Sequence, residues 1–264
     1  MNNRIVIIGA GNVAHNLSSL LQGSHYTIVQ VFSRSNNSAA ALAQQCTCSH
    51  TCNFGEITNA ADIYIFCLSD DANLQYIPRF QHAEKLLIHT SGSMNPAVFA
   101  GLTADYGVLY PLQSLKKEIH IAAAQIPFLI EASNQESFKR IAAIAEAMGA
   151  TYTTADTMQR TWAHISAVFA CNFSNHMLAI ASDIARKNNL DWKMLQPLIE
   201  NTFNRSLHAD PFTVQTGPAY RNEKSVMQKH SEMLHDGFNT YENLYKTISN
   251  SIFEMYYKNK QEDA

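Results

Sequence analysis

The sequence predicts an α/β protein, with a mainly parallel sheet domain over residues 1–154 and an all-α helical domain over residues 155–264. Three observations support this fold class. The first part alternates short β-branched runs with helical patterns, which is typical of strand–helix–strand units in a parallel sheet. Eight of the ten glycines lie in the first 150 residues. From residue 156 onward the apolar spacing is helical, and residues 161–187 contain neither glycine nor proline.

The first domain is predicted from its strands. The runs at 62–69 and 86–91 are almost continuously apolar, as in strands that are covered on both faces. A further short strand should follow a helix that ends near Cys46. A helix with apolar residues on one face should end before Gly149, which can adopt a left-handed cap. The complete set of apolar runs expected as strands is 4–8, 27–33, 62–69, 86–91, 108–110, 127–130 and 151–154.

The second domain should consist of helices at 161–187, 194–204, 225–234 and 241–257. We expect the first of these to be long and largely buried. The last carries an apolar stripe, and such a face often packs against another subunit, which predicts a homodimer through the helical domain. The stripe consists of Leu244, Ile248, Ile252, Met255 and Tyr256.

Composition narrows the class of protein. Nineteen basic and 22 acidic residues give a net charge of −3, and no block of like charges indicates binding to nucleic acid or to an anionic membrane. The five cysteines are an odd number, and no signal peptide precedes the first apolar run, so we expect a cytoplasmic protein. No unbroken apolar run approaches the roughly 18 to 20 residues that a membrane span needs.

The motif Gly9-Ala10-Gly11-Asn12-Val13-Ala14 directly follows the first strand and opens a helix. In this context it predicts a Rossmann-type dinucleotide site. Gly9 permits the tight turn, Gly11 lets the backbone approach a pyrophosphate, and the backbone at Asn12 and Val13 would present N–H groups at the helix start. The alternative is a glycine-rich turn that binds no ligand.

The end of the second strand should select the dinucleotide. An acidic residue at this point binds the ribose hydroxyls of NAD, whereas an arginine accepts the additional phosphate of NADP. Here the sequence reads Ser33-Arg34-Ser35, and residues 1–55 contain no Asp or Glu. NADP is therefore expected, with NAD less favoured. The alternative for Arg34 is a solvated surface arginine.

Two later strand ends should also line the cofactor site, because ligands bind at the carboxyl ends of strands in open α/β sheets. Leu68 and Ser69 follow one strand, and Thr90, Ser91 and Gly92 follow the next. Small polar residues there leave room for a nicotinamide ring, although serine and glycine are also common in plain turns.

A compact set of cysteines and one histidine, at Cys46, Cys48, His50 and Cys52, contains enough groups for four zinc ligands. Its spacing lacks a C-x-x-C pair, and all four residues fall within seven positions. We therefore predict no metal site. A structural metal protein is the weakest of the functional alternatives.

His164 and Asn172 lie eight residues apart, which on one α-helix places them about 80° apart and about 12 Å along the axis. A histidine can exchange protons near neutral pH, and an asparagine can orient a carbonyl. A hydrogen-bonded structural pair is the alternative.

These features together resemble the Rossmann-like proteins with a DUF2520 C-terminal domain, which are grouped with pyrroline-5-carboxylate reductase and 6-phosphogluconate dehydrogenase-like enzymes. The resemblance covers nearly the whole chain and rests on the glycine motif, on Leu68 to Asp71, on His89 to Ser93, on Tyr110 to Ser114, on His164 to Asn172, and on Thr216-Gly217-Pro218 with Arg221 and His230. The sequence departs from the family pattern at Cys171, where serine is usual, and at Asn222-Glu223, where Gly-Asp is usual.

The resemblance implies a C-terminal domain like that of 6-phosphogluconate dehydrogenase and an NADP-dependent oxidoreductase acting on a small molecule, of the imine, keto or hydroxy acid class, in an interdomain cleft. In this hypothesis His164 donates a proton, Asn172 orients the substrate or the ring, and Arg221 anchors an anion. The alternative is a non-catalytic NADP(H)-binding or sensing protein. That alternative is favoured by the absence of a lysine one turn from Asn172, where related dehydrogenases often have one.

Overall fold

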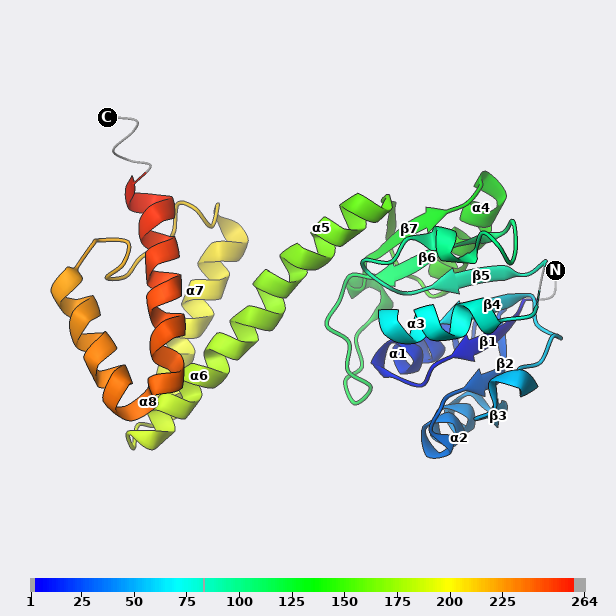
Figure 1. Cartoon of the computed structure of the whole chain (residues 1–264), viewed down its shortest axis with the longest axis horizontal. Coiled ribbons are helices and arrows are strands. Elements are labelled where there is room, and N and C mark those ends of the chain that lie inside the picture. The colour runs from blue at the N-terminus through cyan, green and yellow to red at the C-terminus, as the bar shows by residue number, and fades with distance from the viewer. Residues whose placement is uncertain (1–2, 83, 259–264) are drawn as a thin grey trace. The chain divides into compact units, whose positions relative to one another are not determined.

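The computed structural model describes residues 3–82 and 84–258. Contacts within the chain divide it into two compact units, Met1–Asn172 and Phe173–Ala264. We call them the sheet unit and the helical unit and describe each by itself (Figure 1). The predicted boundary after residue 154 follows the end of the last strand, whereas the contacts keep the next helix with the sheet.

The sheet unit is built on eight strands in the order β3-β2-β1-β4-β5-β6-β7-β8. All neighbouring pairs are parallel except β6 and β7, which are antiparallel. The α/β fold class is confirmed. The strands are β1 Arg4–Ile8, β2 Thr27–Phe32, β3 Ser49–Thr51, β4 Ile63–Phe66, β5 Leu86–His89, β6 Tyr106–Pro111, β7 Phe128–Ala132 and β8 Tyr152–Thr154.

The antiparallel pairing of β6 and β7 has a simple physical cause. A parallel pair needs a crossover connection, which is usually a helix, whereas antiparallel strands can be joined by a loop. The segment between Pro111 and Phe128 contains one 3-10 turn, Ala123–Gln125, and no α-helix. The chain therefore returns along the same edge, and β7 runs opposite to its neighbour.

Helices cover both faces of the sheet (Figure 1). Alternate residues of β1 point to opposite faces, so Ile5 and Ile7 belong to one core cluster while Val6 and Ile8 belong to the other. Helices α1 (Asn12–Leu21), α2 (Asn36–Cys46) and α4 (Gln135–Ala147) pack into the first cluster, and α3 (Asp70–Tyr76) packs into the second. The sheet is thus buried between two helical layers, as the apolar runs predict.

The strand order creates a switch point beside β1. From β1 the chain proceeds outward to β2 and β3, and then returns to β4 on the other side of β1. Ligands in open α/β sheets bind at the carboxyl ends of the strands beside such a point. The predicted glycine turn after β1 and the ends of β2, β4 and β5 therefore meet at one edge.

The predicted helix at 161–187 lies within a longer helical stretch, formed by α5 (Thr157–Ala167), a π-helical segment (Val168–Phe173) and α6 (Ser174–Lys187). The prediction that it is largely buried is wrong: of residues 157–187, only Arg160 and Ala185 are buried. Trp162 is 63% exposed. The apolar spacing is helical, but the surrounding chain supplies too little surface to cover it.

By length and composition, this stretch is also the one candidate membrane span among the described residues, with a mean hydropathy of 1.2 over its most apolar window. No single apolar run produces this value, because polar side chains such as Asn172, Asn175 and His176 interrupt the stretch near its middle. Such groups are costly inside a bilayer.

The helical unit contains α6, α7 (Gln196–His208) and α8 (Lys224–Phe253). Helix α8 is broken at Phe238, whose φ of −150° and ψ of 50° are not helical. It therefore consists of two segments that fold back on one another, drawn orange and red in Figure 1. The separate helices predicted at 225–234 and 241–257 correspond to these two segments.

Candidate functional site

The glycine turn after β1 has the geometry that a dinucleotide site requires. Gly9 has a φ of +115°, and a Cβ atom placed on it would lie 2.4 Å from the carbonyl oxygen of Cys67. Only glycine fits there. At Gly11, a Cβ atom would meet nothing within 4 Å, so the backbone there is open.

Gly11 is also the N-cap of α1, and no side chain caps the helix start. The first N–H groups of α1 are therefore available to an anion. The side chain of Asn12 is engaged elsewhere, because its Oδ1 accepts a hydrogen bond of 3.3 Å from the backbone of Lys117. Val13 is half-buried against the first core cluster, and Ala14 is fully buried beneath the turn. Asn12 and Val13 thus offer their backbone to a ligand.

At the end of β2, Arg34 is exposed, and it forms no ion pair or hydrogen bond with another residue that the structure describes. The neighbouring serines shape the turn. Ser35 caps α2 by accepting a 3.3 Å hydrogen bond from the backbone of Ser38, and the hydroxyl oxygen of Ser33 accepts one from the backbone of Ser35. A guanidinium without a partner, beside the start of α2, is suited to a phosphate group.

Several side chains at the ends of β4 and β5 stabilise the turns there, whereas the sequence predicts that they line the cofactor site. Leu68 packs over Gly9, and Ser69 is the N-cap residue of α3 without a side-chain cap bond. Thr90 and Ser91 are buried: the Thr90 hydroxyl donates to the carbonyl of Phe66, and the Ser91 oxygen accepts from two backbone N–H groups. Their side chains hold the turn that presents Gly92.

Gly92 is where the sheet meets α5. A Cβ atom at Gly92 would lie 2.9 Å from Cγ of His164 and 3.1 Å from Cζ of Tyr110. The Tyr110 hydroxyl and Nδ1 of His164 are 2.9 Å apart, within hydrogen-bonding distance, and the two rings are nearly perpendicular with centroids 5.9 Å apart. We call Gly92, Tyr110 and His164 the Tyr–His cluster. It joins the carboxyl ends of β5 and β6 to α5.

A buried arginine fixes α5 in this position. The side chain of Arg160 is fully buried, forms an ion pair with Glu131 of β7 and donates to the carbonyl of Met94. Arg160 precedes His164 by four residues, so both lie on the same face of α5. Thr157, at the first position of the helix, also donates to Glu131. The orientation of His164 is therefore set by a buried ionic contact one turn before it.

Two groups at the carboxyl ends of β5 and β6 have shifted pKa values. Burial lowers the pKa of His89 to about 3, and the positive charge of Arg160 acts in the same direction, so this imidazole is neutral. Burial raises the pKa of Tyr110, while Arg160 opposes this shift. At neutral pH the Tyr110 phenol therefore keeps its proton.

Asn172 lies in the π-helical segment and is exposed. The expected offset of 80° from His164 assumed a regular α-helix and is wrong. A π-helix closes its turns with i→i+5 hydrogen bonds, so each residue rotates the chain by a smaller angle. Such segments often occur at functional positions.

Arg221 belongs to the helical unit. Its Nε and Nη2 donate to the two carboxylate oxygens of Glu223 at 2.8 and 3.0 Å, so Arg221 has a carboxylate partner although glutamate replaces the usual aspartate. Each partner stabilises the charged form of the other, which raises the pKa of Arg221 and lowers that of Glu223. In the same unit, His230 Nδ1 lies 2.9 Å from the Tyr245 hydroxyl.

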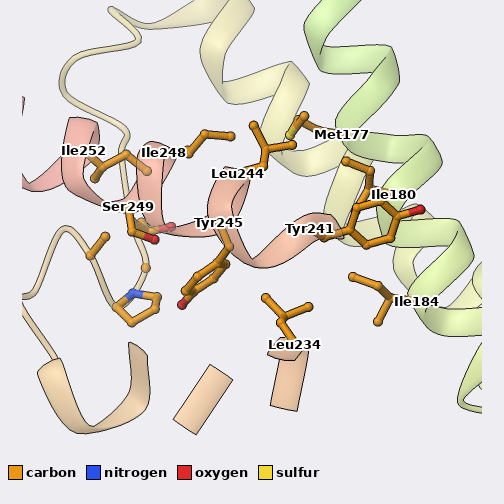
Figure 2. A pocket seen from close by; sticks show the side chains of 14 residues that line it. Met177, Ile180, Ile184, Leu234, Tyr241, Leu244, Tyr245, Ile248, Ser249 and Ile252 are labelled. Atoms are coloured by element: carbon orange, nitrogen blue, oxygen red, sulfur yellow. The ribbon is translucent and has the colours of Figure 1, made fainter. Parts of the chain in front are cut away.

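The helical unit also contains an apolar groove with a cavity of about 300 Å³. Figure 2 shows side chains of α6 and of both segments of α8 around it. The predicted stripe residues Leu244, Ile248 and Ile252 line this groove, as does the Thr216-Gly217-Pro218-Ala219 segment. The stripe therefore lines the same groove as the apolar side chains of α6.

The cysteine cluster is divided between two elements, with Cys46 at the end of α2 and His50 in β3. Among the described residues, no three potential ligands gather at one point. A hydrogen bond from Cys48 lowers the pKa of Cys46 to about 7.

Sequence reasoning missed the importance of Tyr110, Arg160 and Glu131. Tyr110 stands at the end of a predicted strand, which was a usable signal, because strand ends line the site in this fold. No sequence pattern indicates that Arg160 is buried, since arginine in a helix is ordinarily solvated.

Comparisons with known proteins identify the family of this chain. Residues 4–92 match the family model described as NADP oxidoreductase, coenzyme F420-dependent, and residues 126–252 match DUF2520, a domain of unknown function. A crystal structure of a candidate NADP oxidoreductase from Bacteroides fragilis is 38% identical, covers 96% of this chain and 98% of its own, and has a TM-score of 0.88. No functionally curated protein matches the sequence.

More distant structures share the fold. A reductive aminase from Aspergillus terreus, solved with NADPH and ethyl-5-oxohexanoate, is 15% identical over 97% of this chain and 96% of its own, with a TM-score of 0.70. An imine reductase from Myxococcus stipitatus, solved with NADP+, is also 15% identical, over 98% and 94%, with a TM-score of 0.63.

Proposed function

From the premise that this chain belongs to the family of Rossmann-like NADP oxidoreductases with a DUF2520 domain, we propose that it reduces a carbon–nitrogen or carbon–oxygen double bond of a small molecule. The observation that carries the proposal is the Tyr–His cluster. It places two proton-exchanging groups at the same edge of the sheet as the glycine turn.

The cofactor is NADP(H). The open backbone at Gly11 and the uncapped start of α1 suit the pyrophosphate, and the turn that presents them needs a glycine at position 9. The unpartnered Arg34 suits the additional phosphate that distinguishes NADP from NAD. When bound, the reduced nicotinamide supplies the hydride. The residues of the chain bind it, orient the acceptor and provide the proton.

His164 takes the acid–base role, either directly or through the group it contacts. The acceptor atom gains a proton when its double bond is reduced, so a proton-exchanging group must stand near it. Asn172 is proposed to orient the acceptor. Arg221 is proposed as an anion anchor, for which Nη1 remains available because Glu223 holds the other edge of the guanidinium.

Turnover tests this function. The full chain is incubated with NADPH and, separately, with 1-pyrroline, 2-oxobutyrate and butanal, which represent imines, keto acids and aldehydes. We expect loss of NADPH absorbance with at least one class and slower loss with NADH. His164→Ala should reduce turnover, and Met158→Ala, at an exposed position on the same helix, is the control. Tight NADPH binding without oxidation by any of the three would instead indicate a sensing protein.

We also propose that the helical unit pairs with a second copy of the chain. Of its described residues, only Ala185, Ala219 and Ser231 are buried, while Leu198 is 61% and Leu207 is 77% exposed. A unit with so little core of its own needs its apolar faces covered. A second copy carries the same faces, and a two-fold pair covers both at once.

Solution size tests this pairing. Leu198→Glu places a charge on the exposed face of α7 and should shift the protein from dimer to monomer in sedimentation. Asn204→Glu, at an exposed polar position on a different face of the same helix, should leave the dimer intact. A wild-type chain that sediments as a monomer at micromolar concentration would contradict the proposal.

A further inference from the structure

The Tyr–His cluster contains two groups able to deliver a proton, and its geometry distinguishes them. We infer that Tyr110 is the residue that protonates the substrate, and that His164 is a positioning residue which returns the proton to Tyr110 from solvent. This inference rests on the proposed reductase function and assigns the proton step within it.

The position of each group supports this order. Tyr110 is half-buried at the end of β6, next to the β5 end that presents Gly92. His164 is exposed on α5, and its Nδ1 already contacts the Tyr110 hydroxyl at 2.9 Å. The donor in a reduction should stand where water is excluded, whereas a group that restores the proton should reach water. Tyr110 is the more buried of the two groups and suits the donor, whereas the exposed His164 suits the group that restores the proton.

The chemistry balances with one arrangement of protons. With a proton on Nδ1 of His164, the imidazole donates to Tyr110 Oη, and the phenol directs its own proton to the substrate. The Oη–H bond breaks and an N–H or O–H bond forms on the acceptor, while the adjacent carbon receives the hydride from reduced nicotinamide. Nε2 takes up a proton from solvent as the Nδ1–H proton restores the phenol, and exchange with solvent then returns the imidazole to its Nδ1–H form.

Two further contacts favour this relay. The absence of a side chain at Gly92 lets both rings approach the β5 end, because a Cβ atom there would lie within 3.1 Å of each. The buried Arg160 exerts its positive charge on Tyr110, which stabilises the transient phenolate. The same arginine fixes the face of α5 from which His164 projects. The donor Tyr110, the relay residue His164 and the charged Arg160 are therefore positioned by one set of contacts.

The test is a double-mutant cycle on the full chain, with the substrate class that turns over fastest. Tyr110→Phe keeps the ring and removes the hydroxyl, so kcat should fall about 100-fold or more while the Kd for NADPH, measured by fluorescence, is unchanged. His164→Ala should lower kcat, but it should add little in the Tyr110→Phe background, because the relay is already interrupted. Tyr106→Phe, at the other end of β6, is the matched control.

The pH profile gives a second readout. Wild-type kcat should decline in the alkaline range as the phenol ionises, and Tyr110→Phe should lack this decline. If Tyr110→Phe retains kcat within threefold, or if His164→Ala costs the same in both backgrounds, the relay is overturned while the reductase function stands. If the wild type binds NADPH but oxidises it with none of the three substrate classes, the proposed function fails, and the inference fails with it.

Discussion

The two units of this protein differ in how fully they bury their apolar side chains. In the sheet unit, both core clusters lie between Ile5 and Tyr152, and the strands β4 and β5 are buried along their whole length. In the helical unit, large apolar side chains remain exposed on α7, and a groove of about 300 Å³ lies beside the second segment of α8.

The two units differ because different elements are available to bury their apolar faces. A parallel sheet receives its covering from the helices that connect its own strands, so one chain suffices. Helices without a sheet can cover only one another, and in the helical unit this leaves large apolar side chains of α7 exposed. The residues proposed to bind the cofactor all belong to the sheet unit.

The largest expected effect is a loss of stability in the sheet unit. Arg160→Leu removes a buried cation and leaves Glu131 and the Met94 carbonyl without their partner, which should cost about 3 to 5 kcal/mol in the free energy of unfolding. Arg186→Leu, at an exposed arginine of the helical unit, should change it by less than about 0.5 kcal/mol. Urea titration followed by circular dichroism measures both. Equal losses would mean that the two units do not differ as described.

A smaller effect sharpens the comparison at the cofactor. Arg34→Ala should weaken NADPH binding by about 1.5 to 3 kcal/mol, or about 10- to 100-fold, and leave NADH binding unchanged. The helical-unit variant Arg221→Ala should bind NADPH as the wild type does. Fluorescence titration separates these outcomes, and unaltered NADPH binding by Arg34→Ala would exclude this arginine as the phosphate ligand.

The smallest effect is a pH dependence confined to the helical unit. Hydrogen bonds from Lys246, His235 and Ser231 lower the pKa of Glu242 to about 2, from a usual value of 4.5. Because the folded-state pKa is depressed, the stabilisation is complete above pH 4.5 and is lost as the pH falls toward 2. Glu242→Gln should remove this dependence in acid titrations followed by circular dichroism. A titration curve identical to that of the wild type would show that the contacts do not persist in solution.

The sequence was sufficient for the sheet and the glycine turn because local rules decide them. Gly9 needs a positive φ, and the strands at 62–69 and 86–91 need cover on both faces, so each leaves a trace in the residue pattern. The short helix α3 escaped prediction because Asp70 and Asp71 gave no apolar period. The antiparallel direction of β7 was also not predicted. It depends on the absence of a crossover helix between β6 and β7, which no local pattern indicates.

The Tyr–His cluster was only half predictable. His164 can be selected from the sequence as a proton-exchanging residue in a predicted helix, but its partner Tyr110 is 54 residues earlier in the chain, and only the fold brings the two together. Likewise, the burial of Arg160 depends on Glu131, which projects from a strand that no local pattern relates to α5. Contacts between segments that are distant in the sequence produce no periodic pattern from which they could be predicted.

Gly92 has a consequence for how this protein can change over time. Its contribution to the cluster is the volume that it leaves unfilled, and every other amino acid adds at least a Cβ atom that would contact both rings. A tyrosine or a histidine can be replaced stepwise by a residue of similar size and chemistry. Position 92 has no such intermediate, so any substitution that persists there should be accompanied by a smaller residue at 110 or 164.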